Sequence, residues 1–146
     1  MKHAFLGLAL VVSLAVAAPS VAAAPPIVAK PLAVGTIKAT TIKAQSGAAI
    51  LEQITIRPGG SFGWHTHGAP VAVVVAKGTL TVLDPTIGNC APFTVAKGQS
   101  FVEPANHVHL ARNDTRTPVL VYAMYLGVPK PALANVSVAA PTGCSA

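Results

Sequence analysis

From residue 35 onward, hydrophobic and polar residues follow one another in short runs that are separated by glycine, proline, asparagine and aspartate. The alternation is clearest in AAILEQITIR, residues 48–57, where the even positions from Ile50 to Ile56 would share one face of a strand and the odd positions the other. A period of two is typical of a half-buried β-strand. We therefore expect a strand here.

The other runs also predict strands, and none has the period of a long amphipathic helix. They are GTIKATTIKA (35–44), PVAVVVAKG (70–78) and its return strand TLTVLDP (79–85), FTVAKGQSFVEP (93–104), HVHLARN (107–113) and VLVYAMYLGVP (119–129). We expect a hairpin at Lys77–Gly78. Similar Ala-Lys-Gly turns at 76–78 and 96–98 indicate a two-fold arrangement. The pattern predicts an all-β fold, a double-stranded β-helix or jelly roll.

The first residues have the layout of an export signal. Lys2 precedes an uncharged apolar run, and small residues follow, so cleavage is expected near Ala22 or Ala23. An uncleaved membrane anchor is the alternative, but the run from Ala4 to Ala18 is shorter than the ~20 residues that a span needs. The expected organisation is a signal peptide (1–23), an extended Pro/Ala-rich arm (24–34), a barrel (35–128) and a tail (129–146). We expect a secreted or periplasmic protein without a stable membrane anchor after processing.

The chain has two cysteines, Cys90 and Cys144. In an oxidising compartment, two cysteines favour a disulfide over a metal or redox pair. Such a bridge would tie the tail to a mid-chain loop and would stabilise the fold by roughly 4 kcal/mol, less any strain. Two unpaired thiols are the alternative.

The formal charge of +6 changes the picture little. The lysines and arginines are scattered singly, whereas a nucleic-acid surface would cluster them. A nucleic-acid partner is therefore not expected, and the basic balance points instead to solubility and to anionic small-molecule ligands.

Four of the five histidines fall in two short segments. His65 and His67 are two apart in an expected strand, so their side chains would project from one face. Two imidazoles on one face can hold a metal ion when a third ligand comes from elsewhere, and His107 and His109 offer candidates. The alternative is a set of polar residues that line the barrel and bond to one another or to water.

The segment around His65 resembles the first motif of the cupin family. That motif runs glycine, five residues, His-x-His, three or four residues, glutamate, six residues, glycine. Gly59, His65, His67 and Gly78 stand at those spacings, and Val71 stands where the glutamate should be. Valine has no donor atom for a metal.

The second motif of the cupin family is also present. It runs glycine, five residues, Pro-x-Gly, two residues, histidine, three residues, asparagine. Gly98, Pro104, His109 and Asn113 match it, with Asn106 in place of the second glycine. Asparagine tolerates a positive φ better than most residues, so this change is mild.

The resemblance implies a small single-domain cupin barrel in which His65, His67 and His109 bind a divalent transition metal. Neutral imidazoles suit Fe²⁺, Zn²⁺, Ni²⁺, Mn²⁺ or Cu²⁺ without choosing among them. A three-histidine set resembles the cupins that cleave substrates with dioxygen, whereas the lack of the glutamate argues against superoxide- or oxalate-handling members. Cupins often pair through sheet edges, so a homodimer is expected by analogy.

Other polar residues near the motifs have weaker assignments. His107 is expected at the surface or behind the metal ligands. Glu103 is expected either as a solvated loop carboxylate or as a proton acceptor near the barrel mouth. Trp64 should face away from His65 and pack, and of Tyr122 and Tyr125 at most one can face the cavity.

Three functions remain open at this point. The first is a metal-dependent, dioxygenase-like enzyme that acts on a small molecule, with the apolar wall 71–75 shaping its pocket. The second is a non-catalytic barrel that holds a metal or a small ligand, which the scarcity of acid–base residues near the motifs favours. The third is a structural protein stabilised by its disulfide.

Overall fold

The computed structural model describes residues 29–130 and 134–144. Contacts divide the chain into 1–30 and 31–146, and the second unit carries the fold described below. The expected signal peptide, with Ala22 and Ala23, lies outside the described residues. Within the described part of the chain, no helix is both long and apolar enough to cross a bilayer.

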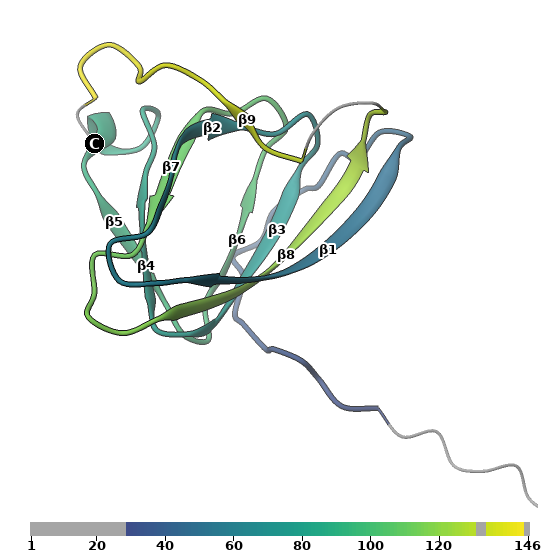
Figure 1. Ribbon diagram of the computed structural model, residues 1–146. Helices are drawn as coiled ribbons and strands as arrows, with labels where there is room; N and C mark the ends of the chain where they lie inside the picture. The colour runs from purple at the N-terminus through teal and green to yellow at the C-terminus, as the bar shows by residue number, and fades with distance from the viewer. Residues whose placement is uncertain (1–28, 131–133, 145–146) are drawn as a thin grey trace, which may run out of the picture. The chain divides into compact units, whose positions relative to one another are not determined.

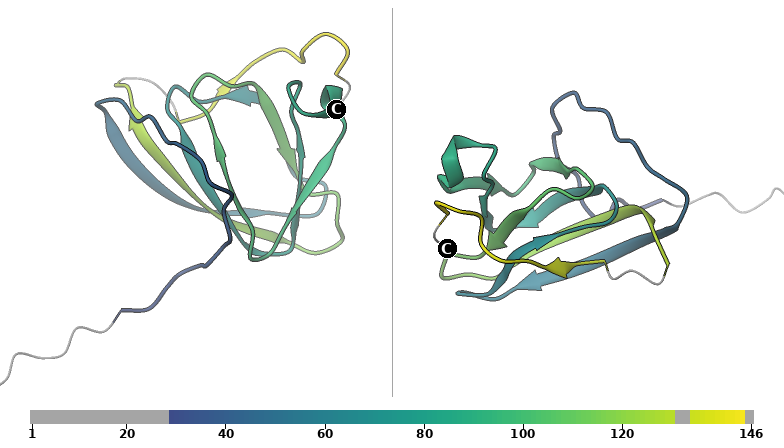
Figure 2. Two further views of the ribbon diagram at one scale, coloured as in Figure 1. Left: turned by 180° about the vertical axis from the view of Figure 1, so that it is seen from behind. Right: turned by 90° about the horizontal axis from the view of Figure 1, so that it is seen from above.

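Two antiparallel sheets make up the fold (Figures 1 and 2). One sheet has the order β1-β8-β3-β6 and the other has the order β5-β4-β7-β2-β9. The strands are β1 (Ala48–Ile56), β2 (Ser61–Thr66), β3 (Val71–Lys77), β4 (Thr79–Leu83), β5 (Phe93–Ala96), β6 (Ser100–Glu103), β7 (His109–Arg112), β8 (Val119–Val128) and β9 (Val136–Ser137). Gly88–Cys90 forms a single 3₁₀ turn, η1. This is the all-β jelly-roll barrel that the hydrophobic pattern predicts.

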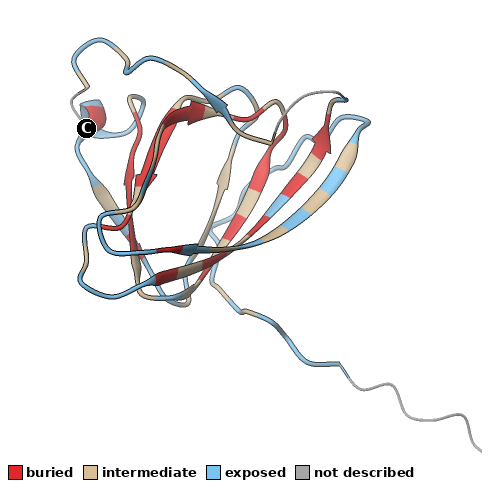
Figure 3. Cartoon of the chain, in the orientation of Figure 1, coloured by how far each residue is buried: buried red, intermediate tan, exposed pale blue. Residues whose placement is uncertain are grey.

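The main core lies between the two sheets. On β1 the even positions turn inward and the odd positions stay exposed, as the alternation predicts (Figure 3). Val71, Val73 and Val75 of β3 are buried at the centre of the core. Burying such side chains stabilises a fold by about 1.5–3 kcal/mol each, so the packing of the two sheets holds the barrel together.

Gly78 does not close a hairpin, which corrects the expectation for Lys77–Gly78. The strands on either side, β3 and β4, belong to different sheets, so the chain turns a corner there. Gly78 has a φ of 78°, and a Cβ at this position would lie 3.1 Å from the carbonyl oxygen of Pro118. The equivalent corner at Gly98 joins β5 to β6, and the Lys97 amide donates to the Gly78 carbonyl at 2.9 Å. The two corners therefore meet, as a two-fold jelly roll requires.

Two segments differ from the expected pattern. Residues 37–47 form no strand, although Thr36 makes one parallel bridge to Gln99. Ile37 and Ile42 are five positions apart, so they could not share a strand face, and both are exposed. The tail, which has no clear periodicity, supplies β9, and β9 pairs with β2 at His65 and Thr66.

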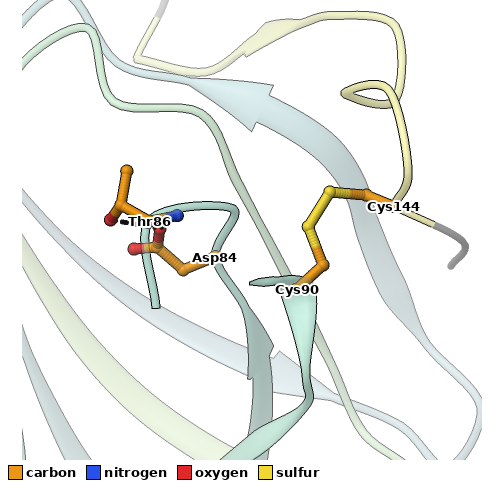
Figure 4. Close-up of a disulfide and its surroundings, with 4 residues drawn as sticks. All are labelled: Asp84, Thr86, Cys90 and Cys144. Atoms are coloured by element: carbon orange, nitrogen blue, oxygen red, sulfur yellow. Dashed lines mark hydrogen bonds between the residues drawn. A yellow bond between two sulfur atoms is a disulfide. The ribbon is translucent and has the colours of Figure 1, made fainter. Parts of the chain in front are cut away.

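A second, smaller core lies on the outer side of β2 and β7. Trp64 packs there with Leu83, Cys90 and Leu110, facing away from the histidines as predicted. Cys90 is bonded to Cys144, with Cα atoms 5.5 Å apart, which is an ordinary disulfide separation. Figure 4 shows how this bond fastens the end of the tail to the loop after β4.

Candidate metal site

Three histidines meet inside the barrel. His65 and His109 lie directly opposite each other on the paired strands β2 and β7, and His67 follows the last residue of β2. All three are almost fully buried, and one nitrogen from each lies within 4.8 Å of the others. These are the three residues that the two motifs indicate, and they form a cluster that could hold a metal ion.

Each of the three rings is held by a backbone carbonyl. The Nδ1 atoms of His65, His67 and His109 lie 2.9 Å, 2.8 Å and 3.1 Å from the carbonyl oxygens of Gly63, Ala134 and His107. A carbonyl can only accept, so Nδ1 carries a proton, and in the neutral ring Nε2 is left with a lone pair. Metal-binding histidines in proteins are commonly oriented in this way. The donor set therefore fits a transition metal.

Glu103 lies against this cluster and is not a solvated loop carboxylate. Its carboxylate oxygens are 3.2 Å from Nε2 of His67 and 3.1 Å from Nε2 of His109, and its side chain is 11% exposed. Burial alone would raise the pKa of the carboxyl group, but the contacts with His109 and His67 outweigh it and lower the pKa to about 2. Glu103 is therefore a fixed negative charge at neutral pH.

The imidazoles differ in their electrostatic surroundings. Burial lowers the pKa of His65 to about 4, so this ring is neutral at pH 7 and ready to bind a metal. Burial would also lower the pKa of His109, but the hydrogen bond and the charge of Glu103 prevail and raise it. A metal ion would have to displace a proton from the His109–Glu103 pair.

His107 lies beside the cluster without joining it. Its ring stacks on that of His109 with centroids 6.4 Å apart, and its Nε2 lies 2.7 Å from Oδ2 of Asp84. Burial would raise the pKa of Asp84, but hydrogen bonds from Thr86 (Figure 4) and His107 lower it. Asp84 and His107 thus form an acid–base pair next to the metal site, and the sequence reasoning did not include Asp84.

A cavity of about 550 Å³ adjoins the site. It lies along β5 and β6, the strands that end the two sheets, and residues 36–40 form part of its wall. The polar groups of His109, Glu103, His107 and Asp84 face it together with the rings of Phe93 and Phe101 and the side chain of Lys38. The wall 71–75 does not line this cavity, because its inward side chains are packed in the core.

The structure also assigns faces to the two tyrosines. Tyr125 is the buried one, with its ring centroid 5.3 Å from that of His67. Tyr122 points outward, and its hydroxyl donates to Gln53 at 2.9 Å. Asn113, the last residue of the second motif, is fully buried and donates to the carbonyls of Ile56 and Thr117, so it locks a turn and does not face the metal site.

Two contributions to the site carry no local sequence signal. The Ala134 carbonyl reaches His67 from 67 residues away, and residues 36–40 meet the cavity from the N-terminal side. Only the expected disulfide hinted that the tail returns to the barrel. The Ala134 contact leaves no mark in the sequence, because a backbone carbonyl can come from any residue type.

Comparisons with known proteins agree with the motifs. The cupin domain family matches residues 53–125, which is half of the chain. One similar solved structure is a Bacillus halodurans protein, with 21% identity, a TM-score of 0.50 and a match that covers 57% of this chain and 65% of that one. A second is the polyketide cyclase RemF of Streptomyces resistomycificus, with 18% identity, a TM-score of 0.52 and 64% of each chain covered. A third is the DMSP lyase DddQ of Ruegeria pomeroyi, with 19% identity, a TM-score of 0.51 and coverage of 62% of this chain and 43% of that one. Each match covers less than two thirds of the other protein, and at these identities it shows the fold alone. No curated protein matches the chain.

Proposed function

The chain belongs to the cupin family, and we propose that it is an exported, metal-dependent cupin that binds a small molecule beside the metal and oxidises it with dioxygen. The observation that carries the proposal is the convergence of three imidazole nitrogens next to a cavity that can hold a small molecule. Buried, oriented imidazoles are what a catalytic metal centre needs.

His65, His67 and His109 would hold a divalent transition metal. When bound, the metal would supply Lewis acidity and open positions for oxygen and substrate. The chain's own residues do the remaining work. The rings of Phe93 and Phe101 give the cavity an apolar wall against which a small molecule could pack. Asp84 holds His107 at the cavity, where its imidazole can exchange a proton with a bound molecule.

Lys38 would favour an anionic or acidic small molecule, because it is the one cation with an ammonium group among the residues that line the cavity. The named structural neighbours, a polyketide cyclase and a DMSP lyase, act on small molecules as well. Their names describe chemistry other than oxygenation, so they support a small-molecule ligand and not the choice of reaction.

A second candidate is a barrel that holds a metal or a small ligand without turning it over. The pairing of Asp84 with His107 favours it, because these two ionisable groups of the cavity wall are already hydrogen-bonded to each other. Oxygen uptake by the metal-loaded protein, measured with a panel of catechols, diketones and thiols, separates the candidates. Substrate-dependent uptake supports the enzyme, and its absence across the panel together with ligand binding supports the second candidate.

Metal analysis tests the site itself. We expect the purified protein to carry about one equivalent of transition metal, and the His65→Ala variant to carry almost none. His107→Ala is the matched control. It also removes one imidazole, but that ring lies beside the cluster and bonds to Asp84 instead of to the three histidines. If the wild type carries no more metal than His65→Ala, the proposal is wrong.

Export and assembly are further parts of the proposal. The Cys90–Cys144 disulfide supports an oxidising, extracytoplasmic compartment. The mass of the mature chain should place its first residue after Ala22 or Ala23. Sizing in solution should give a homodimer, and a mass equal to that of a single chain would contradict that expectation.

A further inference from the structure

The chain contains only four acidic residues, and one of them lies inside the metal site. Glu52 and Asp114 are elsewhere, and Asp84 is engaged by Thr86 and His107. Glu103 alone reaches the histidine cluster. Burying a carboxylate in a barrel is unfavourable unless a cation or hydrogen bonds compensate it, so its position requires an explanation.

The sheet register supplies a structural reason for its position. In the cupin motif a glutamate stands where this chain has Val71. Strand β6 runs antiparallel to β3, and Glu103 is the residue directly opposite Val71. Directly opposed residues point to the same face of a sheet, with Cβ atoms about 4.5–5.5 Å apart. The carboxylate of Glu103 therefore projects into the barrel from β6, at the position that is paired with Val71 on β3.

The arrangement of lone pairs indicates a cation. Because Nδ1 of each ring bonds to a carbonyl, the Nε2 lone pairs of His67 and His109 point toward the same region, with the two nitrogens 3.3 Å apart. The carboxylate oxygens of Glu103 approach these same two nitrogens at 3.2 Å and 3.1 Å. Atoms that all present lone pairs repel one another unless a positive charge lies between them. A proton on one nitrogen, shared with Glu103, meets that need for that pair of atoms only, whereas a metal ion meets it for all of them at once.

We propose that Glu103 is the fourth metal ligand and replaces, from the neighbouring strand, the glutamate that the first motif lacks. This inference rests on the proposed metal site. It changes the ligand set from three neutral imidazoles to three imidazoles and one carboxylate, which lowers the net charge of the centre by one. Carboxylate oxygen suits Mn²⁺ better than imidazole does, whereas imidazole suits Zn²⁺ and Cu²⁺. The argument from Val71 against the carboxylate-containing cupins therefore no longer applies.

The test compares metal binding by four full-length proteins prepared without metal. They are the wild type, Glu103→Gln, the exchange variant Val71→Glu/Glu103→Val, and Glu52→Gln as a control that makes the same substitution in β1 of the same sheet. Each is titrated with Co²⁺, whose visible spectrum reports its ligands, and with Mn²⁺ in competition. Thermal unfolding of the metal-free proteins shows whether each variant is folded.

We expect Glu103→Gln to bind Co²⁺ about 10- to 100-fold more weakly, with a changed visible spectrum and a larger loss for Mn²⁺ than for Co²⁺. Glu52→Gln should match the wild type. A folded exchange variant should regain most of the lost affinity, because it returns the carboxylate to the same face. If the exchange variant does not fold, the isosteric Glu103→Gln variant decides the question by its spectrum.

Two results would overturn the inference. One is a Glu103→Gln variant that binds Co²⁺ as the wild type does. The other is weaker binding with an unchanged spectrum, which would mean that Glu103 only positions the histidines. In both cases the wild type still binds metal and the proposed function stands. A wild type that binds no Co²⁺ would instead refute the metal site as a whole.

Discussion

The two halves of the candidate metal site are built differently. The histidine half comes from the five-stranded sheet, where two paired strands carry the rings and three backbone carbonyls orient them. The carboxylate half comes from the four-stranded sheet and consists of one side chain, Glu103, at the end of the edge strand β6. The histidines are thus fixed by several contacts each, whereas the carboxylate is fixed mainly by its register with Val71.

This difference shows which parts of a metal site can move during evolution of a barrel. His65 and His109 are oriented by carbonyls two residues away, so each must keep its place in the chain next to the residue that holds it. A long side chain that only has to reach the centre can come from any strand whose register gives it the correct face. The following predictions test how strongly the surrounding structure holds the three histidines in place.

The largest effect should come from the disulfide, which fastens the tail that supports His67. The variant Cys90→Ser/Cys144→Ser should lose about 4 kcal/mol of unfolding free energy, because the bond closes a loop of 54 residues in the unfolded chain. Urea unfolding of the variant and of the reduced wild type should give the same loss. Equal stability of the oxidised and reduced proteins would contradict the prediction.

Asn113 supports the turn that follows β7, the strand that begins with His109. Asn113→Ala should lose about 2–4 kcal/mol, because it removes the amide that donates to the buried Ile56 carbonyl and to the Thr117 carbonyl, and it removes the oxygen that accepts from Thr115. Thr115→Ala is the control and should lose about 1 kcal/mol, since it removes one partly exposed hydroxyl. Urea unfolding of both variants measures these losses, and equal losses would show that Asn113 is not the centre of this turn.

The pH response should reveal His65. Burial lowers its pKa to about 4 in the folded protein, so the unfolded chain binds a proton near pH 6.5 that the folded chain does not. Its contribution to stability is therefore full above pH 6.5 and is lost as the pH falls toward about 4. Melting temperatures of the metal-free protein should fall more steeply over this range than those of His65→Gln. Parallel curves would contradict the assigned burial of His65, because the opposite contribution of His109 is common to both proteins.

The smallest effect should come from Asp84, which lies outside both halves. Asp84→Asn should reduce stability by about 1–2 kcal/mol, because it weakens the hydrogen bonds from Thr86 and His107. Its Co²⁺ affinity should stay within about threefold of the wild type, below the 10- to 100-fold loss typical of a group that directly supports a metal ligand. A larger loss of Co²⁺ would mean that the Asp84–His107 pair supports the metal centre.

The sequence predicts much of the fold because the strands are amphipathic at short range. The alternation over 48–57 and the spacing of His65, His67 and His109 are local patterns, and local patterns can be read without a structure. The disulfide expectation also agrees with the structure, since Cys90 and Cys144 were the only pair available. The hairpin expected at Gly78 is a corner in the structure, because a Lys-Gly turn can close a hairpin or carry the chain from one sheet to the other equally well.

The rest of the site depends on which strands become neighbours, and that is set by long-range packing. Val71 and Glu103 are 32 positions apart, and only the register of β3 with β6 makes them equivalent. The strand β9 has two residues and no periodicity, so its pairing with β2 could not be predicted from sequence. The same is true of the Ala134 carbonyl, which any residue type could supply.

The course of the tail has a consequence for maturation. One short stretch of chain carries the carbonyl that orients His67, pairs with β2, and ends at a cysteine whose bond forms only by oxidation. Oxidation of the two thiols is thereby linked to the proposed metal site, because the segment that the disulfide fastens also carries the carbonyl that orients His67. A thiol reductant, which releases the tail, and a chelator, which competes for the metal, should therefore both weaken metal binding at this site.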